Sequence, residues 1–368
     1  MTNLTTQHAM LKKEIDDAIQ RVILSGRFIL GPEVEAFEKE IAAYCGVKYA
    51  VGVASGTDAL TLSLMASGVK FGDEVITTPF TFIATAEAIS HCGAVPVFVD
   101  IDRRTYNIDT NKIESKITDR TRAIIPVHLF GQPVEMDPIL KLSKKHGITI
   151  IEDCAQALSA KYREQGVGSI GDAGCFSFFP SKNLGAYGDG GMIVTSNTQI
   201  FDVAKMLRQH GAKSTGYHVL PGFNSRLDEM QAAILRVKFK YLDKWSSLRR
   251  EAASLYTQLL SGIGGIQTPY IAEYKVTSAN YYTVCLNDNE TDRNDLREFL
   301  SSKDIETAVY YPLSLHLQQA YKTLGYKLGD FPESEKAQNQ VLSLPMFPEI
   351  SHYQVAEVAD GIKEFFTK

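Results

Sequence analysis

The chain has 368 residues, of which 22% are charged, and its formal net charge is −5. This mild acidity, with lysine and arginine scattered among aspartate and glutamate, argues against a nucleic-acid partner and against a polybasic membrane surface. Five unclustered cysteines, an odd number, predict neither a disulfide framework nor a metal site.

The N-terminal region is predicted to be helical. Its opening residues lack the apolar core of a signal peptide, and no apolar run in the sequence approaches the roughly 18 residues of a membrane span, so we expect a cytoplasmic protein. Apolar residues recur at helical spacing from Met10 to Ile23, and this helix should end at Ser25-Gly26. A second helix is predicted to begin after Gly31-Pro32 and to run to about Cys45.

A repeating pattern of short apolar runs and helical segments follows. The runs are rich in β-branched residues and cover 50–54, 75–78, 95–99, 123–127 and 148–151. Strand, helix, strand is typical of an α/β fold with a mostly parallel central sheet covered on both faces. Ligands of such sheets bind at the carboxyl ends of the strands, so the residues that follow each run are the candidate site residues.

Three of these strand ends carry residues suited to a planar, phosphorylated ligand. Gly56 and Thr57 open a helix after the first run, where they form either a phosphate cradle or an ordinary helix start. Phe82 follows the second run and could belong to the core or cover a ring in the cleft. Asp153 follows the fifth run and could keep a pyridine nitrogen protonated, or cap a helix.

The stretch from Phe176 to Gly191 is the centre of the interpretation. An apolar strand over 175–179 stops at Pro180, Lys182 follows, and four glycines then lie within seven residues. A lysine delivered there can lose solvent, lower its pKa and form a Schiff base with an aldehyde cofactor such as pyridoxal phosphate (PLP). The alternative is a solvated turn lysine.

The remaining residues predict a helix over 200–210, a polar loop over 211–222 and a long helical stretch opened by residues 223–228 and reaching about Leu260. Beyond it, strands at 281–286 and 307–311, a helix at 292–300 and two terminal helices are typical of an α+β unit. We therefore predict a large domain over residues 1–250 and a smaller C-terminal α+β domain over residues 251–368.

Taken together, several motifs resemble one family. They are Gly56-Thr57, the segment from Glu152 to Gln156, Phe176-Ser177 with Lys182 five residues after the serine, and Asn224-Ser225-Arg226. This combination is similar to the DegT/DnrJ/EryC1/StrS nucleotide-sugar aminotransferases, which are PLP enzymes of fold type I. The similarity runs almost from end to end, through 31–34, 128–133 and 343–346.

The resemblance implies a role for each matching residue. Lys182 matches the Schiff-base lysine and Asp153 the partner of the pyridine nitrogen, so both are the expected catalytic residues. The other expected cofactor contacts are Gly56, Thr57 and Ser177 at the phosphate, Phe82 on the ring face, Gln156 at the ring hydroxyl and Asn224 from a neighbouring subunit. Arg226, Tyr311 and His316 are candidate substrate contacts, although Arg226 could equally be a structural ion-pair member.

The implied activity is transfer of an amino group from L-glutamate to a nucleotide-diphosphate keto-sugar, with pyridoxamine phosphate (PMP) as the intermediate form of the cofactor. The resemblance further implies a homodimer with shared active sites and a place in cell-surface glycan or deoxyamino-sugar biosynthesis. A UDP- or dTDP-linked 3-keto sugar is favoured, and a 4-keto sugar stays open. The alternatives are a PMP-dependent sugar dehydratase, which carries histidine in place of Lys182, and a non-catalytic regulator on the same fold.

Overall fold

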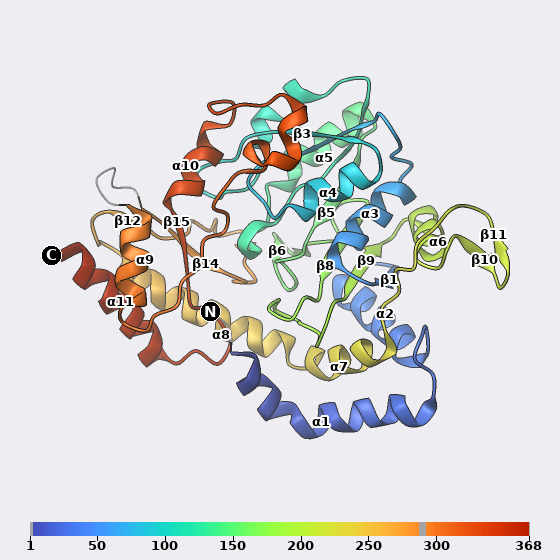
Figure 1. The fold of residues 1–368 in the computed structure, drawn as a ribbon, viewed down its shortest axis with the longest axis horizontal. Coiled ribbons are helices and arrows are strands. Elements are labelled where there is room, and N and C mark those ends of the chain that lie inside the picture. Colours follow the sequence, from blue (N-terminus) through green and yellow to red (C-terminus); the bar gives the residue numbers. More distant parts are fainter. Residues whose placement is uncertain (1–2, 287–291, 368) are drawn as a thin grey trace.

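A seven-stranded sheet lies at the centre of the computed structural model, which describes residues 3–286 and 292–367 (Figure 1). The strand order is β1-β9-β8-β5-β4-β2-β3, and β9 alone runs antiparallel to its neighbours within this sheet. The strands are β1 (Tyr49–Val53), β2 (Glu74–Thr77), β3 (Val95–Phe98), β4 (Thr121–Ile124), β5 (Thr149–Asp153), β8 (Ala173–Ser177) and β9 (Gly191–Thr195). The predicted α/β fold with a mostly parallel central sheet is confirmed.

Both faces of this sheet are buried, which explains why its strands read as continuous apolar runs. In β9, Met192 and Val194 pack into the hydrophobic cluster that contains Phe37, whereas Ile193 packs into the cluster of the opposite face with Leu62. Side chains alternate between the two faces of a strand, so a sheet covered twice needs apolar residues at every position. The covering helices are α2 (Pro32–Cys45), α3 (Gly56–Ala66), α4 (Ala84–His91), α5 (Met136–His146) and α6 (Thr198–Leu207).

The N-terminal helix α1 (Leu4–Ser25) ends where the sequence predicts, at Gly26 with a φ of 65°. Its apolar stripe packs along α7 (Glu229–Phe239), as Figure 1 shows at the lower edge of the molecule. The long helix predicted up to Leu260 is two helices, because the chain breaks between α7 and α8 (Leu242–Leu260). The predicted polar loop contains a short hairpin, β10 (Ala212–Ser214) with β11 (Tyr217–His218), which protrudes from the body.

The C-terminal part contains β12 (Ile266–Gln267), β14 (Tyr282–Leu286), β15 (Val341–Leu344), α9 (Arg293–Ser301), α10 (Pro332–Gln340) and α11 (His352–Thr367). A second small sheet joins β6 (Lys161–Tyr162) and β7 (Gln165–Gly166) to β13 (Lys275–Val276). The strand predicted at 307–311 is wrong: Ala308 makes one isolated bridge to Ser343, and β15 takes the place beside β14. Beyond that bridge the chain turns toward the cavity described below.

The division of the chain into two domains stays a prediction. One hydrophobic cluster draws its buried members from Ala252 to Ile362 and is separate from the clusters of the central sheet. Helix α8, however, crosses the predicted boundary at residue 250, and a further cluster joins Phe80 and Val127 to Val341. None of the helices in residues 3–286 and 292–367 combines the length and apolarity that a bilayer span requires.

Candidate functional site

A cavity of about 570 Å³ opens at the carboxyl ends of the parallel strands. Its walls come from the segments that follow β1, β2, β4, β5 and β8, which is where the fold class predicts a ligand. The C-terminal part closes one side through Val309, Tyr310 and Tyr311. Residues that are far apart in the sequence, such as Gly56 and Tyr311, therefore face one space.

The cavity brings together most of the residues that the sequence singles out. It is lined by Gly56, Thr57, Phe82, Asp153, Gln156, Ser177, Lys182 and Tyr311. Three candidates, Asn224, Arg226 and His316, do not line this cavity. The Asn224 side chain is exposed, and Arg226 is half-buried. His316 is 2% exposed, and its Nε2 lies 2.9 Å from Glu335 Oε1. The structure therefore gives His316 a packing partner in place of a position at the cavity.

The start of α3 forms a tight cradle on one side of the cavity. Ser55 caps the helix by accepting a hydrogen bond from Asp58 N at 3.0 Å, and the N–H groups of Gly56 and Thr57, which precede Asp58 in the first turn, are the ones that can bind a ligand. A Cβ placed on Gly56 would lie 2.7 Å from Ser177 Cβ. Free N–H groups and the positive end of the helix dipole suit a phosphate, and the approach of Ser177 adds a hydroxyl.

We expect Gly56→Ala to weaken cofactor binding by at least about 10-fold, because its methyl group must displace Ser177 from the cradle. Titration of the apoprotein with PLP, followed by absorbance, measures the affinity. Gly166→Ala is the matched control, since a Cβ at Gly166 meets nothing within 4 Å. Equal affinity in the two variants would rule out a phosphate cradle at Gly56.

Lys182 projects from a tightly wound turn. Its N–H donates to Phe179 O at 2.9 Å, and Ala186 N donates to Phe178 O at 2.8 Å. A Cβ on Gly185 would lie 2.2 Å from Pro180 O, so only glycine fits where the chain folds back against Pro180. Burial lowers the pKa of Lys182 to about 8, and the charge of Asp153 opposes this shift. A substantial fraction of this lysine is therefore a neutral, nucleophilic amine near pH 8.

Asp153 is the acidic partner in the cavity. Thr85 Oγ1 donates to Asp153 Oδ2 at 2.7 Å, and Ala155 N donates to Oδ1 at 3.1 Å. Burial raises the pKa of Asp153, while these hydrogen bonds and the charge of Lys182 act in the opposite direction. A buried carboxylate held in this way can share a proton with a ring nitrogen.

A buried framework behind Asp153 was not predicted from the sequence. His128 Nδ1 accepts from Val134 N at 3.0 Å, so Nε2 carries the proton that it donates to Glu152 Oε2 at 2.9 Å. Glu152 also accepts hydrogen bonds from three backbone N–H groups, at Gly168, Ile170 and Gly171. His128 N in turn donates to Asp153 O at 3.0 Å. This network fixes the strand end that presents Asp153.

The same histidine and glutamate lie within 4.8 Å of the Cys154 thiol, a spacing that can hold a metal ion. The carboxylate oxygens of Glu152 are already taken by hydrogen-bond donors, and burial raises the pKa of the Cys154 thiol well above its usual value. A protonated thiol and a saturated carboxylate are poor ligands, so the group is explained by its hydrogen bonds.

Gln156 and Tyr311 form the wall opposite the cradle. Gln156 Oε1 accepts from Phe130 N at 2.7 Å, and its Nε2 donates to Tyr311 OH at 2.9 Å. Burial raises the pKa of Tyr311 well above its usual value, so the phenol stays neutral and its own hydrogen is available to a ligand. The rings of Tyr311 and Phe82, which is 56% exposed, have centroids 6.2 Å apart.

Comparisons with known proteins show which family the chain resembles. The DegT/DnrJ/EryC1/StrS aminotransferase family matches residues 9–363. The chain is 48% identical over 368 residues to a Geobacillus stearothermophilus protein called pleiotropic regulatory protein, covering 100% of this chain and 98% of the relative. It is 46% identical over 363 residues to the UDP-N-acetyl-3-dehydro-alpha-D-glucosamine 3-aminotransferase of Acidithiobacillus ferrooxidans, covering 99% and 96%.

Solved structures of aminotransferases also match the fold of the chain. The fold matches Streptomyces venezuelae DesV, solved in complex with a ketimine intermediate, with a TM-score of 0.97 and 41% identity over 100% of this chain and 98% of that one. Aminotransferases of this fold depend on PLP, and the solved relatives include forms with PMP. The chain therefore belongs to the DegT/DnrJ/EryC1/StrS aminotransferase family.

Proposed function

We propose that this enzyme moves an amino group from L-glutamate to the 3-keto carbon of a sugar carried by UDP or dTDP. The observation that carries the proposal is the cavity itself, where a lysine with a pKa of about 8 and a buried carboxylate stand at adjoining strand ends. The 46% identity to a UDP-sugar 3-aminotransferase supports the C3 position. A 4-keto sugar is the second candidate.

The residues of the cavity fit PLP. The first turn of α3, Thr57 and Ser177 would hold the phosphate, in the cradle that a Cβ at Gly56 would fill. Phe82 would cover the ring face, Asp153 would pair with the ring nitrogen, and Gln156 would contact the ring hydroxyl. When bound, PLP withdraws electrons from the carbon that carries the amino group.

The chemistry of the chain's own residues follows from their surroundings. Lys182 would hold the cofactor through Nζ at rest and, once the donor amine has displaced it, serve as a base. As a base, Nζ would take the proton from the α-carbon of L-glutamate and later give it up again. Asp153, held by Thr85 and Ala155, would keep the ring nitrogen protonated. The same two residues then act in reverse order on the keto-sugar.

Two other activities are less well supported. A PMP-dependent dehydratase of this scaffold would carry histidine at the position of Lys182. The regulatory name of one relative raises the possibility of a regulator, but the cradle, the lysine of lowered pKa and the buried carboxylate together form a reactive site. Turnover by the purified protein separates an enzyme from a regulator.

The test of this function is a reaction of the purified, PLP-loaded protein with L-glutamate and either a UDP-linked 3-keto or 4-keto N-acetyl sugar. We expect one equivalent of 2-oxoglutarate for each amino sugar formed, with kcat/KM at least about 100-fold higher for the 3-keto substrate. Repeating the pair with dTDP-linked sugars identifies the nucleotide. Conversion without 2-oxoglutarate would contradict an aminotransferase, and faster conversion of the 4-keto sugar would overturn the assignment to C3.

The proposal includes a homodimer in which Asn224 reaches the cofactor phosphate of the other subunit. Asn224 is exposed and lies among exposed apolar side chains, which a second copy of the chain would cover; these include Tyr217, Val219 and Phe223. The neighbouring Ser225 is buried and donates from Oγ to Asp58 Oδ2 at 2.6 Å, so the segment is firmly held beside α3. The exposure of Asn224 on a held segment supports this proposal.

Mixing two inactive variants tests this sharing directly. We expect Asn224→Ala and Lys182→Ala homodimers to be impaired alone, and a refolded equimolar mixture to recover about a quarter of the parent activity, because half of the dimers carry one intact site. Asn224→Ala should also bind PLP more weakly. If Asn224 served its own subunit, the mixture would show no recovery above its parts.

We further propose a cytoplasmic location and a role in supplying amino sugars for cell-surface glycans such as O-antigen or for deoxyamino-sugar products. All five cysteines are free, in keeping with a reducing compartment. Nucleotide sugars of the kind named for the relatives are the substrates that such glycan assembly would require.

A further inference from the structure

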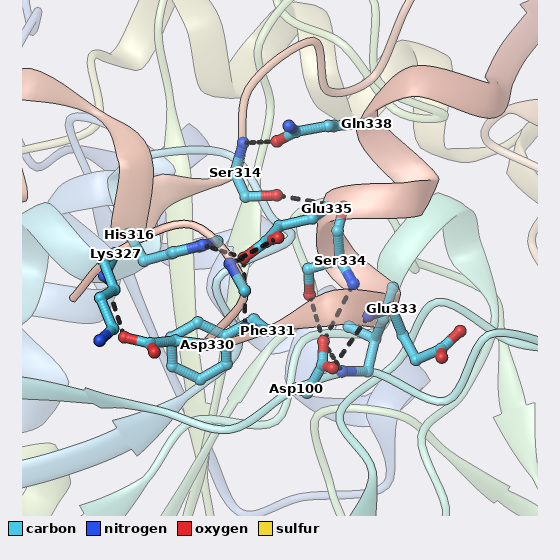
Figure 2. Close-up of polar contacts among 12 residues, drawn as sticks. Asp100, Ser314, His316, Lys327, Asp330, Phe331, Glu333, Ser334, Glu335 and Gln338 are labelled. Carbon is cyan, nitrogen blue, oxygen red and sulfur yellow. Dashed lines mark hydrogen bonds and ion pairs between the residues drawn. The ribbon is translucent and has the colours of Figure 1, made fainter.

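The first turn of α10 is capped by a residue of the central sheet. Asp100 follows β3 and is 5% exposed; its Oδ2 accepts from Glu333 N at 3.0 Å, and its Oδ1 accepts from Ser334 N at 3.0 Å and Ser334 Oγ at 2.7 Å (Figure 2). The residue before the helix, Phe331, makes no side-chain cap. A carboxylate at this end also complements the helix dipole, so Asp100 fixes α10 to the large sheet.

The same helix holds the segment that leaves the cavity. Ser314 N donates to Gln338 Oε1 at 2.7 Å, and Ser314 Oγ donates to Ser334 O at 3.2 Å. His316 Nε2 lies 2.9 Å from Glu335 Oε1, and the side chain of His316 is fully buried. Figure 2 shows these contacts converging on one face of α10. Two residues of the segment, Ser314 and His316, are thus fastened to the helix.

Glu335 is a second carboxylate in this group that accepts several hydrogen bonds. Its Oε1 and Oε2 accept from Gly329 N at 2.8 Å and 2.9 Å, and Oε1 also accepts from Phe331 N at 3.3 Å. Oε1 faces all of these donors, namely Gly329 N, Phe331 N and His316 Nε2, and Oε2 shares Gly329 N. A glutamine at position 335 would keep the shape, but it would remove the negative charge that these donors face and turn its NH2 group toward Gly329 N.

The segment that is held by α10 lies close to the cavity wall in the sequence. Tyr311 precedes Ser314 by three positions, and Leu315 N donates to Pro79 O at 2.8 Å, at the start of the loop that carries Phe82. Phe82 and Tyr311, two of the aromatic residues that line the cavity, therefore belong to segments that are joined to each other and to α10. Movement of the 314–316 segment would shift Tyr311 relative to Gln156, whose Nε2 holds its hydroxyl at 2.9 Å.

We propose that Glu335 and Asp100 are positioning residues for the sugar half of the reaction, acting through α10 and the 314–316 segment on Tyr311. The proposal rests on the proposed function. L-Glutamate is small and reacts close to Lys182, whereas a nucleotide sugar also needs the wall formed by Val309, Tyr310 and Tyr311. Loosening that wall should weaken sugar binding and leave the donor half-reaction unchanged.

The test compares Glu335→Gln with Glu333→Gln in the PLP-loaded full-length enzyme. We expect Glu335→Gln to raise KM for the UDP 3-keto sugar by about 10-fold, the size of one lost hydrogen bond to a charged group, with the single-turnover rate of the glutamate half-reaction within about 2-fold of the parent. Glu333→Gln is the matched control, because it lies on the same helical turn and its carboxylate pairs with the exposed Lys336 at 3.5 Å.

A double-mutant cycle separates positioning from general loosening. Tyr311→Phe combined with Glu335→Gln should be no worse than the poorer single variant, because both act on one contact. Asp100→Asn should also raise KM for the sugar, and it replaces Glu335→Gln in the test if that variant fails to fold. Calorimetric binding of the UDP-amino-sugar product provides a second readout. Equal losses in both half-reactions, or additive losses with Tyr311→Phe, would overturn the inference. Failure of the parent to aminate any nucleotide sugar would instead overturn the proposed function, and this inference with it.

Discussion

Lys182→Ala is expected to lose all measurable transamination, because the variant lacks both the group that holds PLP and the base that moves the proton. An essential base contributes about 10²–10⁴-fold by itself, and loss of covalent attachment adds to that. The measurement is 2-oxoglutarate release with the variant saturated in PLP, together with the absorbance spectrum of the bound cofactor. Removing the side chain should not unfold the protein, since burial of this amine lowers its pKa and its charge is poorly solvated.

Two controls make this result specific. Lys182→Arg keeps a long cationic side chain but cannot become neutral near pH 8, so it should be as inactive as Lys182→Ala. Ser181→Ala changes the neighbouring residue of the same cavity wall and should stay within a few fold of the parent. Turnover by Lys182→Ala above the level of free PLP would show that another group carries the chemistry.

The pH dependence of cofactor capture follows from the same side chain. The neutral amine is the form that reacts with an aldehyde, and the pKa of Lys182 is lowered to about 8. The rate of PLP incorporation into the apoprotein should therefore rise about tenfold per pH unit below that value and level off above it. A rate that kept rising to pH 10 would assign capture to a lysine with an ordinary pKa.

Asp153→Asn should lower the rate of the glutamate half-reaction by about 10²–10⁴-fold without weakening the fold. Asparagine keeps the size of the side chain but carries no negative charge, so it cannot keep the ring nitrogen protonated. Burial raises the pKa of Asp153, so a neutral residue relieves desolvation; this gain offsets the cost of turning an NH2 group toward Thr85 or Ala155, and the melting temperature should stay close to that of the parent. Stopped-flow absorbance and a thermal melt measure the two effects.

Thr85→Val is the matched control for this prediction. It removes the 2.7 Å hydrogen bond to Asp153 Oδ2 but leaves the carboxylate in place, so its loss of rate should be much smaller. A half-reaction within about 3-fold of the parent in Asp153→Asn would remove Asp153 from the mechanism. A loss in Thr85→Val equal to that in Asp153→Asn would mean that the hydrogen bond, rather than the charge, is what matters.

The local parts of this fold could be predicted because their signals lie in short stretches. Strands such as β5 and β8 are largely buried and therefore appear as apolar runs; Asp153 ends β5, and Lys182 lies five residues beyond β8. The segment 307–311 was wrongly predicted to be a strand for the same reason, because the alternation of Val309 and Tyr311 with other residues resembles a strand pattern. In the structure those residues face a cavity and a hydrophobic cluster, and only Ala308 pairs.

The sequence could not predict contacts between residues that are far apart along the chain. Glu152 and His128 are 24 residues apart, and the burial of their hydrogen bond depends on β4 and β5 lying side by side. His316 resembles a substrate residue by its position, but the structure pairs it with Glu335, which belongs to a helix 19 residues further on. Such contacts depend on tertiary packing, which local patterns do not encode.

The most direct test of the account is to reduce the PLP-loaded protein with borohydride and to map the modified residue by peptide mass spectrometry. The account predicts one pyridoxyl group per chain, on the peptide that contains Lys182, and its absence from Lys182→Arg. A pyridoxyl group on any other lysine, or none at all in protein that is active, would contradict it.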